Sequence, residues 1–177
     1  RHLVNPRGIA VDPRDGSFYV SEAEAHTILK VSTTQQPWRL ERYFGDFLDP
    51  GTSPGKLDGP HGLLLDAARD TLFVAERDGH VVRALELRTP PTSRVVAGTP
   101  GEYGFRDAAN ATGALLNRPE ALALAADGSL YVADTGNHRV RLIRHPLEPG
   151  LTSIETVTGL GLPGSGEGPA AALQPID

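Results

Sequence analysis

The strongest constraint on the fold of this chain is that its sequence repeats three times. A segment that begins at Pro6 aligns without a gap with a segment that begins 54 residues later at Pro60, and a third copy begins at Pro119. Self-similarity of this kind is the signature of repeat architectures, in which each unit buries its faces against its neighbours. The matched positions hold glycines, an aromatic residue, an acid and a histidine: Gly8 and Gly62; Tyr19, Phe73 and Tyr131; Glu22, Glu76 and Asp134; His26, His80 and His138.

Each copy predicts four short β-strands. The first is a nearly continuous apolar run (IAV, LLL or LAL), as expected of a strand that is buried on both faces. In the second strand, side chains alternate between the two faces, with the aromatic residue on one of them. In two copies, an Asp-Gly pair at 15–16 or 127–128 predicts the tight turn between the first and second strands. The fourth ends at a spacer glycine, which is Gly45, Gly98 or Gly159. Four antiparallel strands repeated radially describe a β-propeller blade, so the predicted fold class is all-β.

The third copy carries a family resemblance. Its segment YVADTGNHRVRLI, which starts at Tyr131, and the preceding spacer VVAGTPGEYGFRD resemble the NHL repeat, whereas the first two copies have SEAEAH and AERDGH in place of ADTGNH. The resemblance implies a ring of about six blades. Three blades alone would be insufficient, because blades bury their faces only against neighbouring blades. The whole chain, 1–177, is then one propeller segment with blades at about 1–45, 57–98 and 116–159 and the start of a fourth at about 169–177.

Composition narrows the possible functions. The net charge of −5 disfavours non-specific binding to nucleic acid or to an anionic membrane, and no apolar run is long enough for a membrane span. The absence of cysteine excludes thiolate metal sites and cysteine nucleophiles. Because the chain starts at Arg1 and contains no methionine, we expect it to be an excerpt of a longer protein. The rest of the ring then lies outside it, or another subunit completes the ring.

The repeated acid and histidine are the most regular polar constellation. Glu22, Glu76 and Asp134 each end the second strand of a copy, and His26, His80 and His138 follow four residues later. Carboxylates and imidazoles arranged around an axis suit a divalent metal. The alternative is that the acid caps the following turn through backbone N–H groups while the histidine packs at the start of the third strand. Repetition in every copy favours the structural alternative, so we predict no metal and no cofactor.

A second set of residues varies between copies within a constant framework. Arg7, His61 and Glu120 each follow the proline that opens a copy. Variable side chains on a rigid scaffold are typical of a binding surface, although solvated loop positions of no consequence would look the same. By resemblance, these positions share one loop face with the turns after the second strands. The residues predicted to contact a partner on this face are therefore Arg7, His61, Glu120, Glu22, Glu76 and Asp134.

Other candidate residues favour ordinary structural roles. Asp12 and Asp66 close the first strand but are replaced by Ala125 in the third copy, which favours turn formation over an axial ring of carboxylates. Arg139, Arg141 and Arg144 make a basic third strand that suggests RNA binding or, as we prefer in an acidic chain, a solvated outer face. Trp38 could anchor an interface, but packing between blades is the more ordinary role.

The sequence motif Asn110-Ala111-Thr112 is a candidate glycosylation site, which slightly favours an extracellular or cell-surface location.

The repeat and its residues favour the function of a non-catalytic interaction or scaffold module that binds a protein partner, another domain or another subunit. No nucleophile elbow, phosphate-binding glycine loop or HExxH motif is present. The alternative is half of a metal-dependent propeller enzyme, because the resemblance extends to an amidating lyase and to lactonases. That alternative needs unequal inward-pointing ligands from several blades. Nucleic-acid binding is the least favoured function because of the charge.

Overall fold

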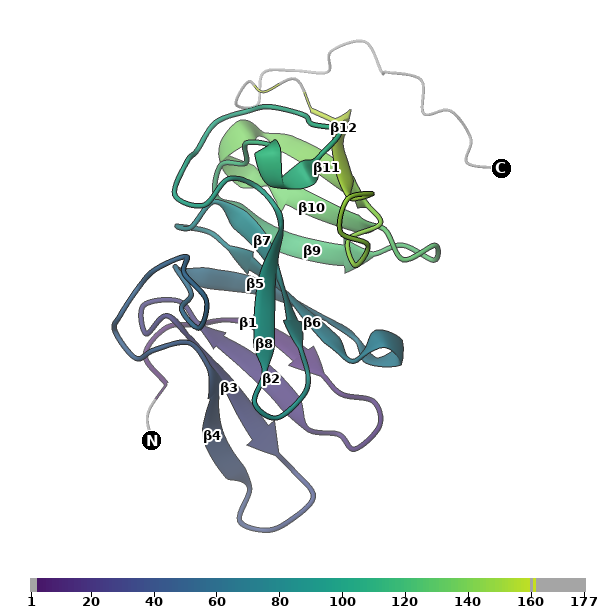
Figure 1. Cartoon of the computed structure of the whole chain (residues 1–177). Helices are drawn as coiled ribbons and strands as arrows, with labels where there is room; N and C mark the ends of the chain where they lie inside the picture. The colour runs from purple at the N-terminus through teal and green to yellow at the C-terminus, as the bar shows by residue number, and fades with distance from the viewer. Residues whose placement is uncertain (1–2, 160, 162–177) are drawn as a thin grey trace.

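The computed structural model describes residues 3–159 and 161, and within them the chain folds into three four-stranded antiparallel sheets (Figure 1). Each sheet is a meander in which consecutive strands pair. The predicted all-β propeller blades are thereby confirmed, and the expected fourth blade at 169–177 lies outside the described residues. The strands are β1 Pro6–Val11, β2 Phe18–Glu22, β3 Thr27–Ser32, β4 Arg39–Phe44, β5 Pro60–Asp66, β6 Thr71–Glu76, β7 Val81–Glu86, β8 Thr92–Ala97, β9 Pro119–Leu124, β10 Leu130–Asp134, β11 Arg139–Arg144 and β12 Ser153–Thr158.

The inner strands of the three blades lie side by side around the propeller axis, with β5 between β1 and β9. Gly8 and Gly62 are needed where these strands meet. A Cβ atom on Gly8 would lie 2.2 Å from the carbonyl oxygen of His61, and one on Gly62 would lie 2.5 Å from the carbonyl oxygen of Glu120. The glycines of the first two copies therefore let the backbone of the next blade approach closely.

Two apolar clusters join the blades. In β6, Leu72 and Val74 face the first blade, where they pack with Tyr19 and Ile28. Phe73 points the other way and packs against the third blade in the second cluster. Alternation along one strand thus supplies both interfaces of the middle blade, as the pleat of a β-strand requires.

The third aromatic of the repeat, Tyr131, is only half-buried, whereas its equivalents Tyr19 and Phe73 are buried. The reason is its position in the third blade. Its neighbours Leu130 and Val132 pack toward the second blade, so Tyr131 points away from it. The aromatic position is therefore a core position only where the next blade covers it.

The turns follow the sequence in part. Gly16 and Gly128 adopt positive φ values of 74° and 89°, as predicted for the two Asp-Gly turns. Trp38 departs from our expectation, because it is 58% exposed at the start of the outer strand β4 and does not pack between blades. In the described part of the chain, no helix has the length and apolar character to cross a bilayer.

Candidate functional site

The repeated acids are buried and bind the chain that enters their own blade. Each accepts a backbone N–H from the residue two positions before the proline that opens the blade: Val4 to Glu22 Oε2 at 2.7 Å, Asp58 to Glu76 Oε2 at 2.8 Å, and Asn117 to Asp134 Oδ1 at 2.7 Å. We expected these acids to cap the turn that follows them, so the N–H donors come from a different segment. The role is structural, as the repetition indicated.

In the second and third blades, a buried arginine binds the second carboxylate oxygen. Arg83 donates from Nε to Glu76 Oε1, and Arg141 donates from Nη1 to Asp134 Oδ2 at 2.7 Å. Burial raises the pKa of Glu76, and the charge of Arg83 and its hydrogen bond oppose that rise. Glu76 and Asp134 are fully buried with both oxygens occupied by the chain itself, which corrects our expectation that they contact a partner.

The basic third strand of the last blade is not a solvated face, contrary to our preferred interpretation. Arg141 is 0% exposed, and besides Asp134 it binds Asp107 and the carbonyl oxygens of Leu115 and Arg106. Its partners come from the long connection before the blade, and they could not be read from the strand alone. Of the other two arginines, Arg139 stacks 3.8 Å from the ring centre of Phe105 and Arg144 pairs with Glu155.

Two of the repeated histidines link their blade to the next one. His26 Nδ1 accepts the backbone N–H of Gly59 at 3.1 Å, and His80 Nδ1 accepts that of Arg118 at 3.2 Å. Each donor is the residue directly before the proline that opens the next blade. His26, His80 and His138 all have positive φ, and the would-be Cβ atom of the spacer glycine approaches each histidine carbonyl oxygen to 2.3–2.5 Å: Gly45, Gly98 and Gly159. The repeated acid, histidine and glycine together fasten the connections between blades.

This arrangement predicts that the protein loses stability in mild acid. Burial lowers the pKa of His80 below its ordinary value of 6.5, against the opposing charges of Asp78 and Asp58. The unfolded chain therefore takes up protons first, so stability is fully present above the ordinary pKa and falls as pH decreases through the folded pKa. Urea unfolding between about pH 7.5 and pH 5.5 measures this loss.

The matched variant for this prediction is His80→Asn, because asparagine tolerates the left-handed backbone of that position. Its stability should depend less steeply on pH than that of the parent chain. Burial also lowers the pKa of His61, so part of the slope should remain. An unchanged slope in the variant would contradict the assignment to His80.

At the same end of the molecule, three predicted residues gather around an open hollow of about 480 Å³. Arg7 is exposed, and His61 and Glu120 are half-exposed, one from each inner strand. We call this the axial hollow; its lining is Asn5, Arg7, Ala23, Glu24, His26, His61, Arg77, Asp78 and Glu120.

One residue that lines the axial hollow, Arg77, was not predicted from the sequence. Arg77 donates to Glu120 Oε1 at 3.0 Å and to Asp78 Oδ1 at 2.9 Å, so it joins the second blade to the third across the hollow. It directly follows the repeated acid Glu76, and only its position after that fixed point could have marked it. The hollow therefore presents both charges, with Arg7 free of ion pairs within the described residues.

The geometry offers little for a metal. In the described part of the chain, no three His, Asp or Glu side chains converge as a metal site would require. Oδ1 of Asp12 accepts the backbone N–H of Arg14 at 3.0 Å and Oδ1 of Asp66 accepts that of Arg69 at 3.2 Å, which confirms a turn-forming role. Each carboxylate also pairs with the side chain of the same arginine at 2.7 Å. Because the side-chain hydrogen bond from Arg14 is the largest influence on it, the pKa of Asp12 lies below its ordinary value.

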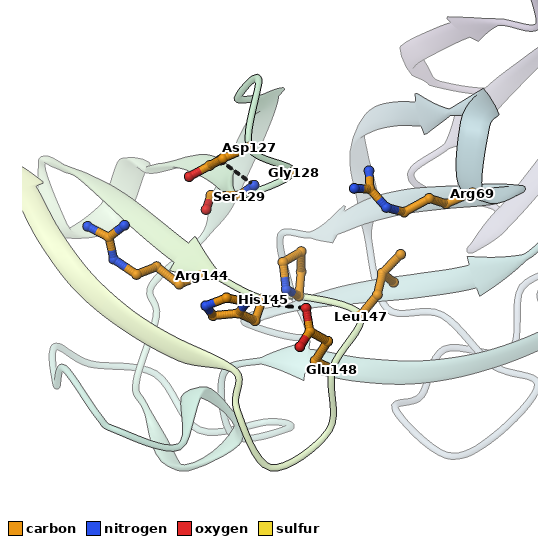
Figure 2. Close-up of a pocket in the computed structure, with 9 residues that line it drawn as sticks. Arg69, Asp127, Gly128, Ser129, Arg144, His145, Leu147 and Glu148 are labelled. Carbon is orange, nitrogen blue, oxygen red and sulfur yellow. Dashed lines mark hydrogen bonds and ion pairs between the residues drawn. The ribbon is translucent and has the colours of Figure 1, made fainter. Parts of the chain in front are cut away.

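A second hollow, of about 140 Å³, lies among the turns at the opposite end of the blades (Figure 2). Its basic groups already have acidic neighbours. His145 contacts Glu148 at 3.2 Å, and Arg69 and Arg144 pair with Asp66 and Glu155. Because its basic groups are already paired with acidic side chains, we assign this hollow no role.

The predicted glycosylation residue Asn110 is exposed, and its Oδ1 accepts from Thr112 Oγ1 at 2.9 Å. Its modification stays a prediction.

Comparison with known proteins places the sequence among repeat proteins. The NHL repeat profile matches residues 116–141. Human Teneurin-4 is 32% identical over 162 residues, which are 81% of this chain and 6% of that protein. The protein SUPPRESSOR OF QUENCHING 1, chloroplastic, of Arabidopsis thaliana is 31% identical over 153 residues, which are 80% of this chain and 14% of that protein. The chain thus spans a small part of each relative.

Solved structures support the fold. A protein of unknown function from Bacteroides thetaiotaomicron superposes with a TM-score of 0.68 at 16% identity, over 85% of this chain and 35% of that chain. An auxiliary nutrient binding protein from Bacteroides ovatus gives a TM-score of 0.62 at 18% identity, over 88% and 37% of the two chains. At these identities the likeness concerns the fold alone.

Proposed function

Because this chain is a segment of an NHL-repeat β-propeller, we propose that it is a non-catalytic interaction module that binds a protein partner at the axial hollow. The observation that carries the proposal is the convergence of Arg7, His61 and Glu120, from three different blades, around one open hollow. They occupy the same position of the repeat but differ in charge and size. A fixed scaffold with changing side chains is what selective binding needs.

The polar residues of the repeat divide into two groups, which further supports this proposal. The acids and arginines that recur are buried and bound within the chain, so they serve the scaffold. The side chains that vary line the hollow, where they are accessible to a partner. Mixed charge at the rim favours a protein surface of complementary charge over an anionic polymer, because such patterns select partners and speed association.

The test begins with cross-linking and mass spectrometry in the source organism, which identifies the proteins that contact the axial hollow. Binding of the identified partner is then measured for Arg7→Glu and for Arg88→Glu. Arg88 is an exposed arginine beyond the end of β7, at the opposite end of the blade.

We expect Arg7→Glu to weaken binding about tenfold, which is ~1.4 kcal/mol, and Arg88→Glu to leave it unchanged. Equal effects of both substitutions, or none from Arg7→Glu, would refute the placement of the interface.

The enzymatic alternative, a metal-dependent propeller, would need a cluster of metal ligands, and no three His, Asp or Glu side chains form one within the described blades. An extracellular or cell-surface location stays part of the proposal, and the candidate glycosylation motif at Asn110 slightly favours it.

A further inference from the structure

The first blade lacks the arginine that neutralises the repeated acid. Arg83 lies opposite Val74 in the β6–β7 pairing, and Arg141 lies opposite Val132 in the β10–β11 pairing. The same register in the first blade pairs Val20 with Leu29. The chain therefore keeps the acid, Glu22, but replaces its cationic partner by an apolar side chain.

Glu22 is left with an unpartnered oxygen. Its Oε2 accepts the backbone N–H of Val4, as the equivalent acids do, but its Oε1 has no hydrogen-bond partner among the described residues. The side chain is only 2% exposed. A buried carboxylate oxygen without a donor is costly, and buried charges in proteins are normally paired.

Glu22 lines a small pocket that we call the Glu22 pocket, with about 20 Å³ of space. This space is comparable to one water-sized group. Two of its walls are exposed side chains, Arg42 of β4 and Phe47, which can move outward to admit a larger group. Arg42 itself contacts Asp46 at 3.4 Å. The lining is Val4, Glu22, Ala25, Thr27, Leu29, Arg42 and Phe47.

We propose that the Glu22 pocket binds one cationic group, an ammonium or a guanidinium, in the place that an arginine of the third strand fills in the other two blades. Three observations converge on this chemistry. The acid is retained and buried, its free oxygen needs a donor, and the equivalent oxygens of Glu76 and Asp134 each bind a guanidinium. A positively charged N–H donor supplies both the hydrogen bond and the charge.

The cationic group can come from a lysine or an arginine of another molecule. The inference does not depend on the proposed function, because a small cation tests the pocket without a partner.

The experiment measures the melting temperature in methylguanidinium chloride and in methylammonium chloride, each against sodium chloride at equal ionic strength. The chains compared are the 177-residue chain, Leu29→Arg and Glu22→Gln. Leu29→Arg restores the missing guanidinium at a position that belongs to neither apolar cluster. We expect it to raise the melting temperature by about 2–4 °C in sodium chloride, the shift that one favourable interaction produces in a chain of this size.

We expect either organic cation to stabilise the parent chain relative to Leu29→Arg and Glu22→Gln, in which the site is filled or uncharged. The absence of a selective response in the parent would overturn the proposal. Should Leu29→Arg fail to fold, Glu22→Gln still decides, because a response equal to that of the parent overturns the proposal as well.

Discussion

Replacement of Arg83 by methionine should lower the free energy of unfolding by about 3–5 kcal/mol, the usual cost of removing one member of a buried ion pair. Methionine keeps much of the aliphatic volume, but the carboxylate of Glu76 remains fully buried without its guanidinium. The oxygens of Ser93 and Thr52 also lose their donor. Urea unfolding at neutral pH measures the loss.

The control is the double variant Arg83→Met with Glu76→Gln, which removes the stranded charge. We expect the double variant to recover part of the lost stability, since an uncharged buried amide costs less than an unpaired carboxylate. The first blade is a second, natural control, because it already holds Leu29 at the arginine position. A loss below about 1 kcal/mol for Arg83→Met would show that the buried pair contributes little to stability.

Phe73→Ala should cost a similar amount, about 3–5 kcal/mol, because truncation of a buried aromatic leaves a cavity. The ring is 0% exposed in the cluster that joins the second and third blades. Chemical denaturation measures this loss, and it should accompany loosening of the third blade, which hydrogen exchange in β10 would detect.

The matched control is Tyr131→Ala, at the same position of the repeat in the third blade. Because Tyr131 is half-buried and points away from the second blade, its truncation should cost clearly less than that of Phe73. Equal losses for the two substitutions would indicate that the third blade's far face is covered in solution.

Much of the fold could be predicted from the sequence because it depends on local patterns. The period of the repeat, the four strands of each copy and the turns at Gly16 and Gly128 follow from apolar alternation and from the φ values that glycine permits. The placement of Arg7, His61 and Glu120 on one face also followed, since equivalent positions of a radial repeat must lie around one axis.

The partners of the polar residues could not be predicted in this way. Glu76 binds the N–H of Asp58, and Arg141 binds Asp107, because connections between blades fold back over the end of each sheet. The exposure of Trp38 could not be predicted either, because whether a residue beside an outer strand is covered depends on what packs next to that strand.

The sequence alone therefore determined the repeat, the strands and the face that carries the variable residues, because backbone geometry and hydrophobic alternation act over a few residues. Only the tertiary structure decided that Glu76 and Asp134 form buried ion pairs and that Arg77 spans the axial hollow. It also decided that Oε1 of Glu22 has no hydrogen-bond partner among the described residues. The physical reason is that desolvation and pairing of charge depend on groups far apart in the chain, which the packing of the blades brings together.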